Sequence, residues 1–233
     1  WSEISDGPVT VYYYGPTESR AQTILRVTNM TVEQMGKVLG LEAVPPIRVI
    51  AYNNSRHMAA ALPPRSAAIR QDLITEGQAW PDKRVVLVMA FSPQVEGIGS
   101  HEIVHVVVAD ATKAAYGVVP TWLNEGLAEY GNLDPGITYD QALNYAIYTR
   151  KLKPLWYLAR FSGDPNDIII GYGQARSVVQ YLVRQYGPEK IAALMKALQE
   201  TMDIDRALQK IYAFDTYGLD SQWRLSLGLD PFP

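Results

Sequence analysis

Residues 101–105 read His-Glu-Ile-Val-His. On a helix, positions i and i+4 lie on the same face, so the imidazoles of His101 and His105 can face one metal ion. Glu102 lies next to them and can act as the general base that takes a proton from an attacking water. The motif therefore predicts zinc-dependent hydrolysis. The alternative for this pentapeptide alone is a helix whose two His side chains make polar contacts and bind no metal.

The sequence around the pentapeptide favours the metal site. The chain has three His residues, and two of them fall in the motif. The flanking residues are apolar, so we expect a buried helix, and buried ionisable groups need a partner. A metal ion is the simplest partner for two His and a Glu. These apolar flanks are Ile103, Val104, Val106, Val107 and Val108.

Residues 122–130, Trp-Leu-Asn-Glu-Gly-Leu-Ala-Glu-Tyr, form the second half of the pattern. Glu125 and Glu129 are spaced i, i+4 and so share a helix face. Gly117 and Pro120 indicate a short loop between this helix and the preceding one. Such a hairpin would bring Glu125 against the two His residues as a third protein ligand, which leaves the fourth position open, as in catalytic zinc sites.

The pair His-Glu-x-x-His and Asn-Glu-x-x-x-Glu resembles the gluzincin metallopeptidases. The sequence of residues 122–130 is most similar to that of the bacterial peptidase MA-like group, which is related to thermolysin-like and aminopeptidase-N-type catalytic domains. The resemblance is strong over residues 98–130, looser to about Trp223 and weak before residue 84. It implies a peptidase acting on a peptide or protein substrate with one catalytic Zn²⁺. The implied ligands are His101, His105 and Glu125, and the implied general base is Glu102.

The resemblance also implies that Asn124 and Glu129 orient the His ligands. A metal-bound imidazole usually donates its other N–H to a carboxylate or carbonyl group, which agrees with that role. The alternative for Glu129 is a solvated surface side chain.

Two differences from related families of zinc peptidases narrow the expected activity. Val108 and Ala111 stand where the metzincin extension would have a Gly and a third His. The Gly-x-Met-Glu-Asn segment, with which aminopeptidase-N-type enzymes hold a free amine, is absent. We therefore expect an endopeptidase rather than an aminopeptidase. Two alternatives stay open, namely an inactive zincin-fold binding or sensing module, and a zinc amidase that cuts a non-peptide or cell-wall amide.

Peptide hydrolysis also needs a donor that stabilises the tetrahedral oxyanion. By resemblance the first candidate is Tyr172, which we expect at a helix start after a Gly-flanked loop. The alternative is an aromatic side chain that only packs on that helix. His57 is a second candidate donor, although such a residue is more often a surface His. Arg176 could bind a substrate carbonyl or carboxylate, or could pair with a surface carboxylate.

Composition excludes several classes of partner. The chain has 233 residues, 48% of them hydrophobic, and a net charge of −3 without a basic stripe, so we expect no nucleic acid. It has no Cys, so a metal site would use nitrogen and oxygen ligands alone. Its apolar runs are far shorter than the ~20 residues that span a bilayer, so we expect no membrane segment. Because the chain opens at Trp1, we expect a secreted or cell-surface protein that has lost a signal or anchor, with the cytoplasm as the alternative.

The remaining pattern predicts an α+β, zincin-like fold. We expect an N-terminal α/β lobe over 1–113, with a small mixed sheet and the active-site helix, and an all-helical lobe over 114–233. The zinc cleft is expected between these lobes of one catalytic domain. The predicted strands are 9–14, 47–52 and 84–90, and the predicted helices of the first lobe are 18–39, 54–62 and 94–112. The predicted helices of the second lobe are 121–131, 138–150, 154–161, 172–186, 188–200, 203–213 and 216–227.

For two segments the sequence pattern predicts the structure less clearly. Residues 65–82 have flanking Pro and Gly and predict an irregular surface loop. Strand 84–90 is an edge strand by the resemblance, and a peptide could pair with it main chain to main chain. Its run of apolar residues fits an interior strand equally well.

Overall fold

The structure of the protein is a computed structural model that describes residues 1–62, 76–161 and 164–232. The chain divides into two compact units. The first unit contains Trp1–Met35, Ala43–Val107 and Gly131–Asp134. The second unit contains Gly36–Glu42, Val108–Tyr130 and Pro135–Pro233. Strands occur in the first unit alone among the described residues, which confirms the α+β class. The cleft between two lobes stays a prediction.

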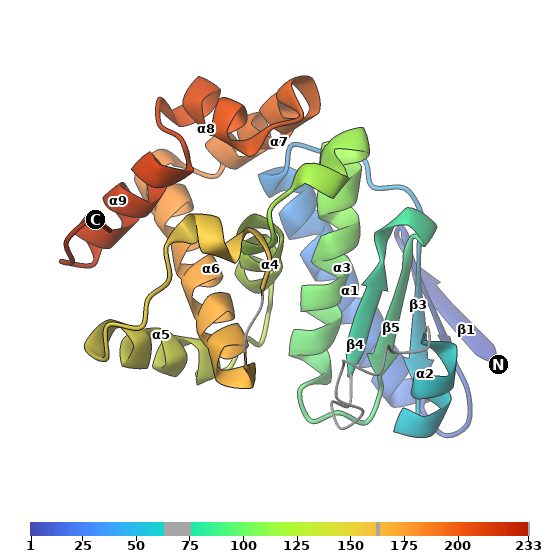
Figure 1. Ribbon diagram of the computed structural model, residues 1–233. Coiled ribbons are helices and arrows are strands. Elements are labelled where there is room, and N and C mark those ends of the chain that lie inside the picture. The colour runs from blue at the N-terminus through green and yellow to red at the C-terminus, as the bar shows by residue number, and fades with distance from the viewer. Residues whose placement is uncertain (63–75, 162–163, 233) are drawn as a thin grey trace. The chain divides into compact units, whose positions relative to one another are not determined.

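The first unit is built on a mixed sheet with the strand order β1–β2–β3–β5–β4 (Figure 1). The central strands β2, β3 and β5 are parallel, and β1 and β4 pair antiparallel at the two edges. Alternate residues of β2 and β3 are fully buried, as a half-buried strand requires. The strands are β1 (Ser2–Asp6), β2 (Val9–Tyr13), β3 (Ile47–Tyr52), β4 (Gly77–Trp80) and β5 (Val85–Met89).

The sheet confirms the interior alternative for strand 84–90 over the edge-strand alternative. Strand β5 pairs with both β3 and β4, so it is an interior strand and not the edge strand. The edge strand on this side of the sheet is β4, in the segment for which the sequence predicts an irregular loop, and residues 65–75 of that segment lie outside the described residues. Gly and Ala are depleted in strands and only Trp80 favours one, so pairing with β5 contributes more to the conformation of β4 than its own sequence does.

Helices α1 (Glu18–Val38), α2 (Ser55–Ala61) and α3 (Val95–Thr112) contribute to the first unit. Helix α3 carries the His-Glu-x-x-His motif and matches the predicted helix. Its valines have modest helix propensity, so burial rather than propensity stabilises it. The hydroxyl group of Ser100 donates to Glu96 O at 2.7 Å and accepts from Leu133 N at 3.0 Å. These bonds hold the segment after α4 against the turn that precedes His101.

The second unit is helical. Its elements are η2 (Lys113–Val118), α4 (Thr121–Tyr130), α5 (Thr138–Tyr148), η3 (Leu155–Ala159), α6 (Pro165–Tyr186), α7 (Glu189–Thr201), α8 (Ile204–Tyr212) and α9 (Thr216–Ser226). The predicted helix over 154–161 is thus a short 3-10 helix. No helix in the described part of the chain is long and apolar enough to cross a membrane.

Helices α4 and α6 lie side by side (Figure 1). The reason is Gly126, where an added Cβ would lie 2.4 Å from Ala175 O and 2.6 Å from Val179 Cγ2. A larger residue there would push α4 away from α6. Gly126 directly follows Glu125, so the packing of α4 on α6 also sets the position of the helical turn that carries the Glu125 carboxylate.

Helix α6 begins earlier than the sequence predicts. The Asp164 side chain accepts from the backbone N–H groups of Asn166 and Asp167, and Pro165 occupies the first helical position. The predicted start at Tyr172 was therefore wrong, and this residue lies inside the helix. The Asp-Pro pair is a helix-start signal that the sequence does contain.

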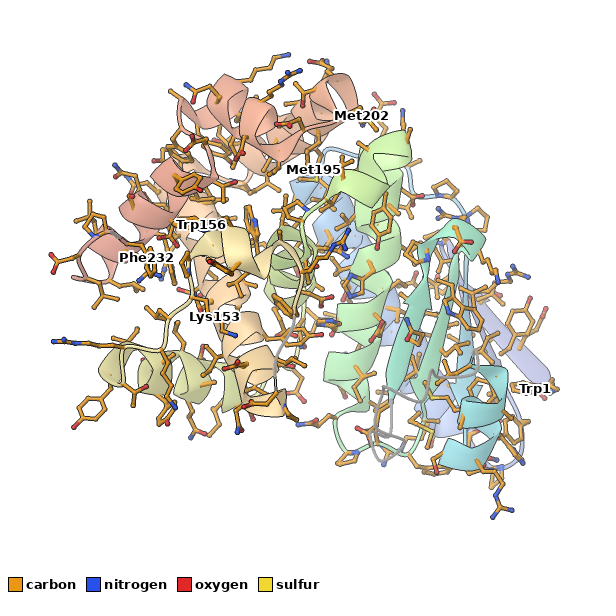
Figure 2. All side chains as sticks on the ribbon, in the orientation of Figure 1. Trp1, Lys153, Trp156, Met195, Met202 and Phe232 are labelled. Atoms are coloured by element: carbon orange, nitrogen blue, oxygen red, sulfur yellow. The ribbon has the colours of Figure 1, made fainter. Side chains whose placement is uncertain are left out.

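The stretch before η3 is anchored by buried polar groups. Gln174 accepts from Lys153 N at 3.0 Å and donates to Lys153 O at 2.9 Å. Arg224 donates to the same carbonyl at 3.1 Å, and its guanidinium lies 5.4 Å from the centre of the Phe232 ring. The ring centre of Phe232 in turn lies 5.7 Å from that of Trp156. Both residues are labelled in Figure 2. These contacts tie the non-helical chain to α6 and α9.

A tyrosine cluster lies among α6, α8 and the turn after α8. Tyr186 packs edge to face on Tyr181 and Tyr212, with centroids 6.2 and 5.1 Å away. Burial, followed by the hydrogen bond and charge of Tyr186, raises the pKa of Tyr181 to about 12. Burial is also the main cause that raises the pKa of Tyr212, whose buried hydroxyl has no hydrogen-bond partner among the described residues.

We expect this cluster to make the fold sensitive to alkali. An unfolded Tyr titrates near pH 10, so above that pH the unfolded chain loses protons that the folded chain keeps. Stability should be unaffected below about pH 10 and should fall as the pH rises from about 10 to about 12. Thermal unfolding midpoints measured from pH 8 to 12 test this. Tyr212→Phe should reduce the alkaline fall, whereas Tyr157→Phe, at an exposed position, should not; equal falls in both variants would contradict the expectation.

Candidate metal centre

The His side chains of α3 face each other on one side of the helix. The Nε2 atoms of His101 and His105 are 3.3 Å apart, and their rings are nearly perpendicular, at 78°. His105 is buried and His101 is half-buried. The i, i+4 spacing therefore gives the convergence that the sequence predicts.

This geometry fits a zinc ion. Two nitrogens that each lie about 2.05 Å from a tetrahedral zinc are separated by about 3.3–3.4 Å, which is the separation of the two Nε2 atoms. One nitrogen from each of His101 and His105 and one carboxylate oxygen of Glu125 all lie within 4.8 Å of one another. Two imidazoles and a carboxylate are a ligand set of catalytic zinc sites.

Glu102 lies on α3 beside the His pair and faces the edge strand β4. A Cβ atom added to Gly77 would lie 2.7 Å from Glu102 Cγ and 2.9 Å from Glu102 Oε1. The carboxylate thus lies directly against the backbone of the edge strand. The sequence does not predict this contact, because Gly77 falls in the segment expected to be irregular.

Two polar side chains of α4, Asn124 and Glu129, differ in burial. Asn124 is half-buried, and its amide donates to the Tyr116 hydroxyl at 3.3 Å. Tyr116 is a contact that no spacing signal in the sequence indicates. Glu129 is 3% exposed, so the solvated alternative for this residue is wrong. Whether Asn124 and Glu129 orient the His ligands stays a prediction.

Tyr172 lies in an aromatic stack within the second unit. Its ring stacks on Tyr139 at 5.2 Å and meets the Phe161 ring edge at 5.1 Å. These contacts hold the ring, and the role of its hydroxyl group stays a prediction. One turn later, Arg176 pairs with Asp140 at 3.2 Å, as the ion-pair alternative expects.

His57 has the surface position expected for it. It lies exposed on α2, and its Nδ1 atom is 2.7 Å from the Tyr14 hydroxyl and 3.0 Å from the Asn54 amide. It is not part of the His-His-Glu group.

Comparison with protein families agrees with this group of residues. The sequence profile described as the peptidase MA superfamily matches residues 27–228, which include α3, α4 and most of the helical unit. A comparison with curated proteins gave no match. Because the matched region covers most of the chain and includes all three potential ligands, the chain belongs to the peptidase MA superfamily.

Proposed function

We propose that this protein is a zinc-dependent endopeptidase. The observation that carries the proposal is the His-His-Glu group, in which two Nε2 atoms have the separation of zinc ligands. Membership of the peptidase MA superfamily supports peptide hydrolysis as the reaction. The missing Gly-x-Met-Glu-Asn amine anchor favours internal cleavage over removal of N-terminal residues.

In this proposal His101, His105 and Glu125 hold the ion. A zinc ion bound there would supply a Lewis acid that polarises the scissile carbonyl and makes water more acidic. Glu102 takes the proton from the attacking water and passes it to the departing amine. Tyr172 is the proposed donor to the oxyanion, and Asn124 is proposed to orient a His ligand.

The edge of β4 that faces away from β5 is the proposed place for the substrate main chain. Met89 N donates to Glu76 O at 2.8 Å, and hydrogen-bonded and non-hydrogen-bonded pairs alternate along an antiparallel ladder. The next residue, Gly77, therefore points its N–H and C=O away from β5. β5 is the partner of β4 among the described strands, so a peptide can pair there irrespective of its side chains.

Replacing Glu129 by Gln tests the proposed orienting role. The side chain keeps its size but loses its charge, so a His ligand that donates to it would become less basic. We expect zinc affinity or turnover to fall roughly 10–100-fold. Zinc titration and steady-state kinetics measure the two effects. Glu96→Gln, on a half-buried residue paired with Arg26, is the control and should change neither; unchanged values in Glu129→Gln would leave Glu129 without this role.

A library of diverse peptides, analysed by mass spectrometry, tests the function itself. We expect internal cuts by the zinc-loaded protein that disappear with a chelator and return when zinc is added. Stepwise loss of N-terminal residues would instead identify an aminopeptidase. An uncut library, from protein shown to contain zinc, would contradict a general endopeptidase and favour the non-peptide amide or the inactive module.

A further inference from the structure

We propose that Gly77 is a positioning residue, whose missing side chain lets the edge strand β4 set the place of the Glu102 carboxylate. The catalytic consequence rests on the proposed function. The contact between Gly77 and Glu102 does not rest on the proposed function, since it is formed by the packing of β4 on α3.

The space beside Gly77 is already filled. A Cβ atom added there would lie 2.5 Å from Ile98 Cγ2, 2.7 Å from Glu102 Cγ and 2.9 Å from Glu102 Oε1. Real Cβ atoms essentially never approach other heavy atoms closer than 3.0 Å. Ile98 and Glu102 are one helical turn apart on the same face of α3. Gly77 therefore lies over the groove between these two side chains, and glycine alone fits at this separation.

The strand has little freedom to move away. Glu76 O accepts from Met89 N at 2.8 Å, and Glu76 Oε2 accepts from the Ser92 hydroxyl at 3.1 Å. On the other side of Gly77, residues 78–80 pair in register with β5, and Ala79 is buried. A methyl group at position 77 would therefore displace the softer partner, the Glu102 side chain, before it displaced the strand.

This predicts a specific loss in catalysis. A misplacement of about 1 Å in a reacting group can reduce the rate about 100-fold. We expect Gly77→Ala to lower kcat roughly 100-fold with KM changed little. Zinc content should equal that of the wild type, because neither His side chain is among the atoms nearest to the added Cβ.

Gly99→Ala is the matched control. It makes the same substitution on α3, but its Cβ would lie 3.6 Å from Thr28 Cγ2, an ordinary contact. Alanine also has the higher helix propensity. We expect full activity and an unfolding temperature no lower than that of the wild type.

The decisive experiment is a double-mutant cycle on the zinc-free protein, read by thermal unfolding. Overpacking in Gly77→Ala should lower the midpoint by roughly 3–8 °C. In a Glu102→Ala background, which removes Cγ and the carboxylate but leaves the contact with Ile98 Cγ2, the same substitution should cost measurably less. If Gly77→Ala alone does not fold, recovery of folded protein in the double variant gives the same support.

Three outcomes would overturn the proposal: equal midpoint losses in both backgrounds, failure of both variants to fold, or unchanged kcat in a Gly77→Ala enzyme with wild-type zinc content. Failure of the proposed function looks different. In that case the wild type cleaves no peptide, while the midpoint losses still show whether Gly77 and Glu102 are coupled.

Discussion

Replacing Glu102 by Gln is expected to reduce kcat about 10²- to 10⁴-fold, the range that general-base catalysis contributes. The amide has nearly the same shape as the carboxylate but cannot accept the proton of the attacking water. Glu102 is not a proposed ligand, so zinc content should stay at the wild-type value. Because the lost interaction belongs to the transition state, KM should change far less than kcat.

The measurement is steady-state cleavage of a fluorogenic peptide chosen from the library, together with metal analysis of the same samples. Glu96→Gln makes the same chemical change on the same helix, at a half-buried residue whose side chain pairs with Arg26, and should keep wild-type turnover. Near-wild-type turnover in a zinc-loaded Glu102→Gln variant would remove Glu102 as the general base.

Loss of a metal ligand is expected to give the second large effect. His101→Ala or Glu125→Ala leaves two protein ligands, and we expect zinc affinity to fall by more than the about 10–100-fold that loss of an outer group costs. Turnover should be lost with the metal. Zinc binding to the folded protein also raises its stability, so the unfolding midpoint of each variant should rise less on addition of zinc than that of the wild type.

Metal analysis after dialysis against a weak chelator, and unfolding with and without zinc, measure these effects. His57→Ala removes the remaining His of the chain, at an exposed position outside the group, and should behave as the wild type. Full zinc content in His101→Ala or Glu125→Ala would overturn the ligand assignment.

The residues of the candidate metal centre could be predicted because their signals are local. His101 and His105 converge through helical spacing, which needs no tertiary information. Glu125 needed one further step, a chain reversal, and Gly117 and Pro120 indicate that reversal. By contrast, Tyr172 was expected at a helix start and lies inside α6, because the Asp164-Pro165 start signal outweighs the glycines that flank Tyr172.

The burial of Glu129 could not be predicted in the same way. A Glu spaced i, i+4 from a candidate ligand is compatible with either a solvated or a buried position, and tertiary packing makes it buried. The contact of Asn124 with Tyr116 is likewise formed by the particular turn that η2 makes. Neither the burial of Glu129 nor the contact between Asn124 and Tyr116 has a periodic signal in the sequence.

The sequence by itself determined the α+β class, most of the helices, the nitrogen and oxygen character of the candidate metal centre, and the residues that converge on it. These features depend on spacing along single helices, on one turn signal at Gly117 and Pro120, and on residue chemistry. Tertiary structure alone decided that β5 is interior, that β4 is the edge strand, and that Gly77 lies against Glu102. The physical reason is that a four-residue strand has too few local interactions to specify itself, so its hydrogen-bond partners on β5 and its packing on α3 come from distant parts of the chain.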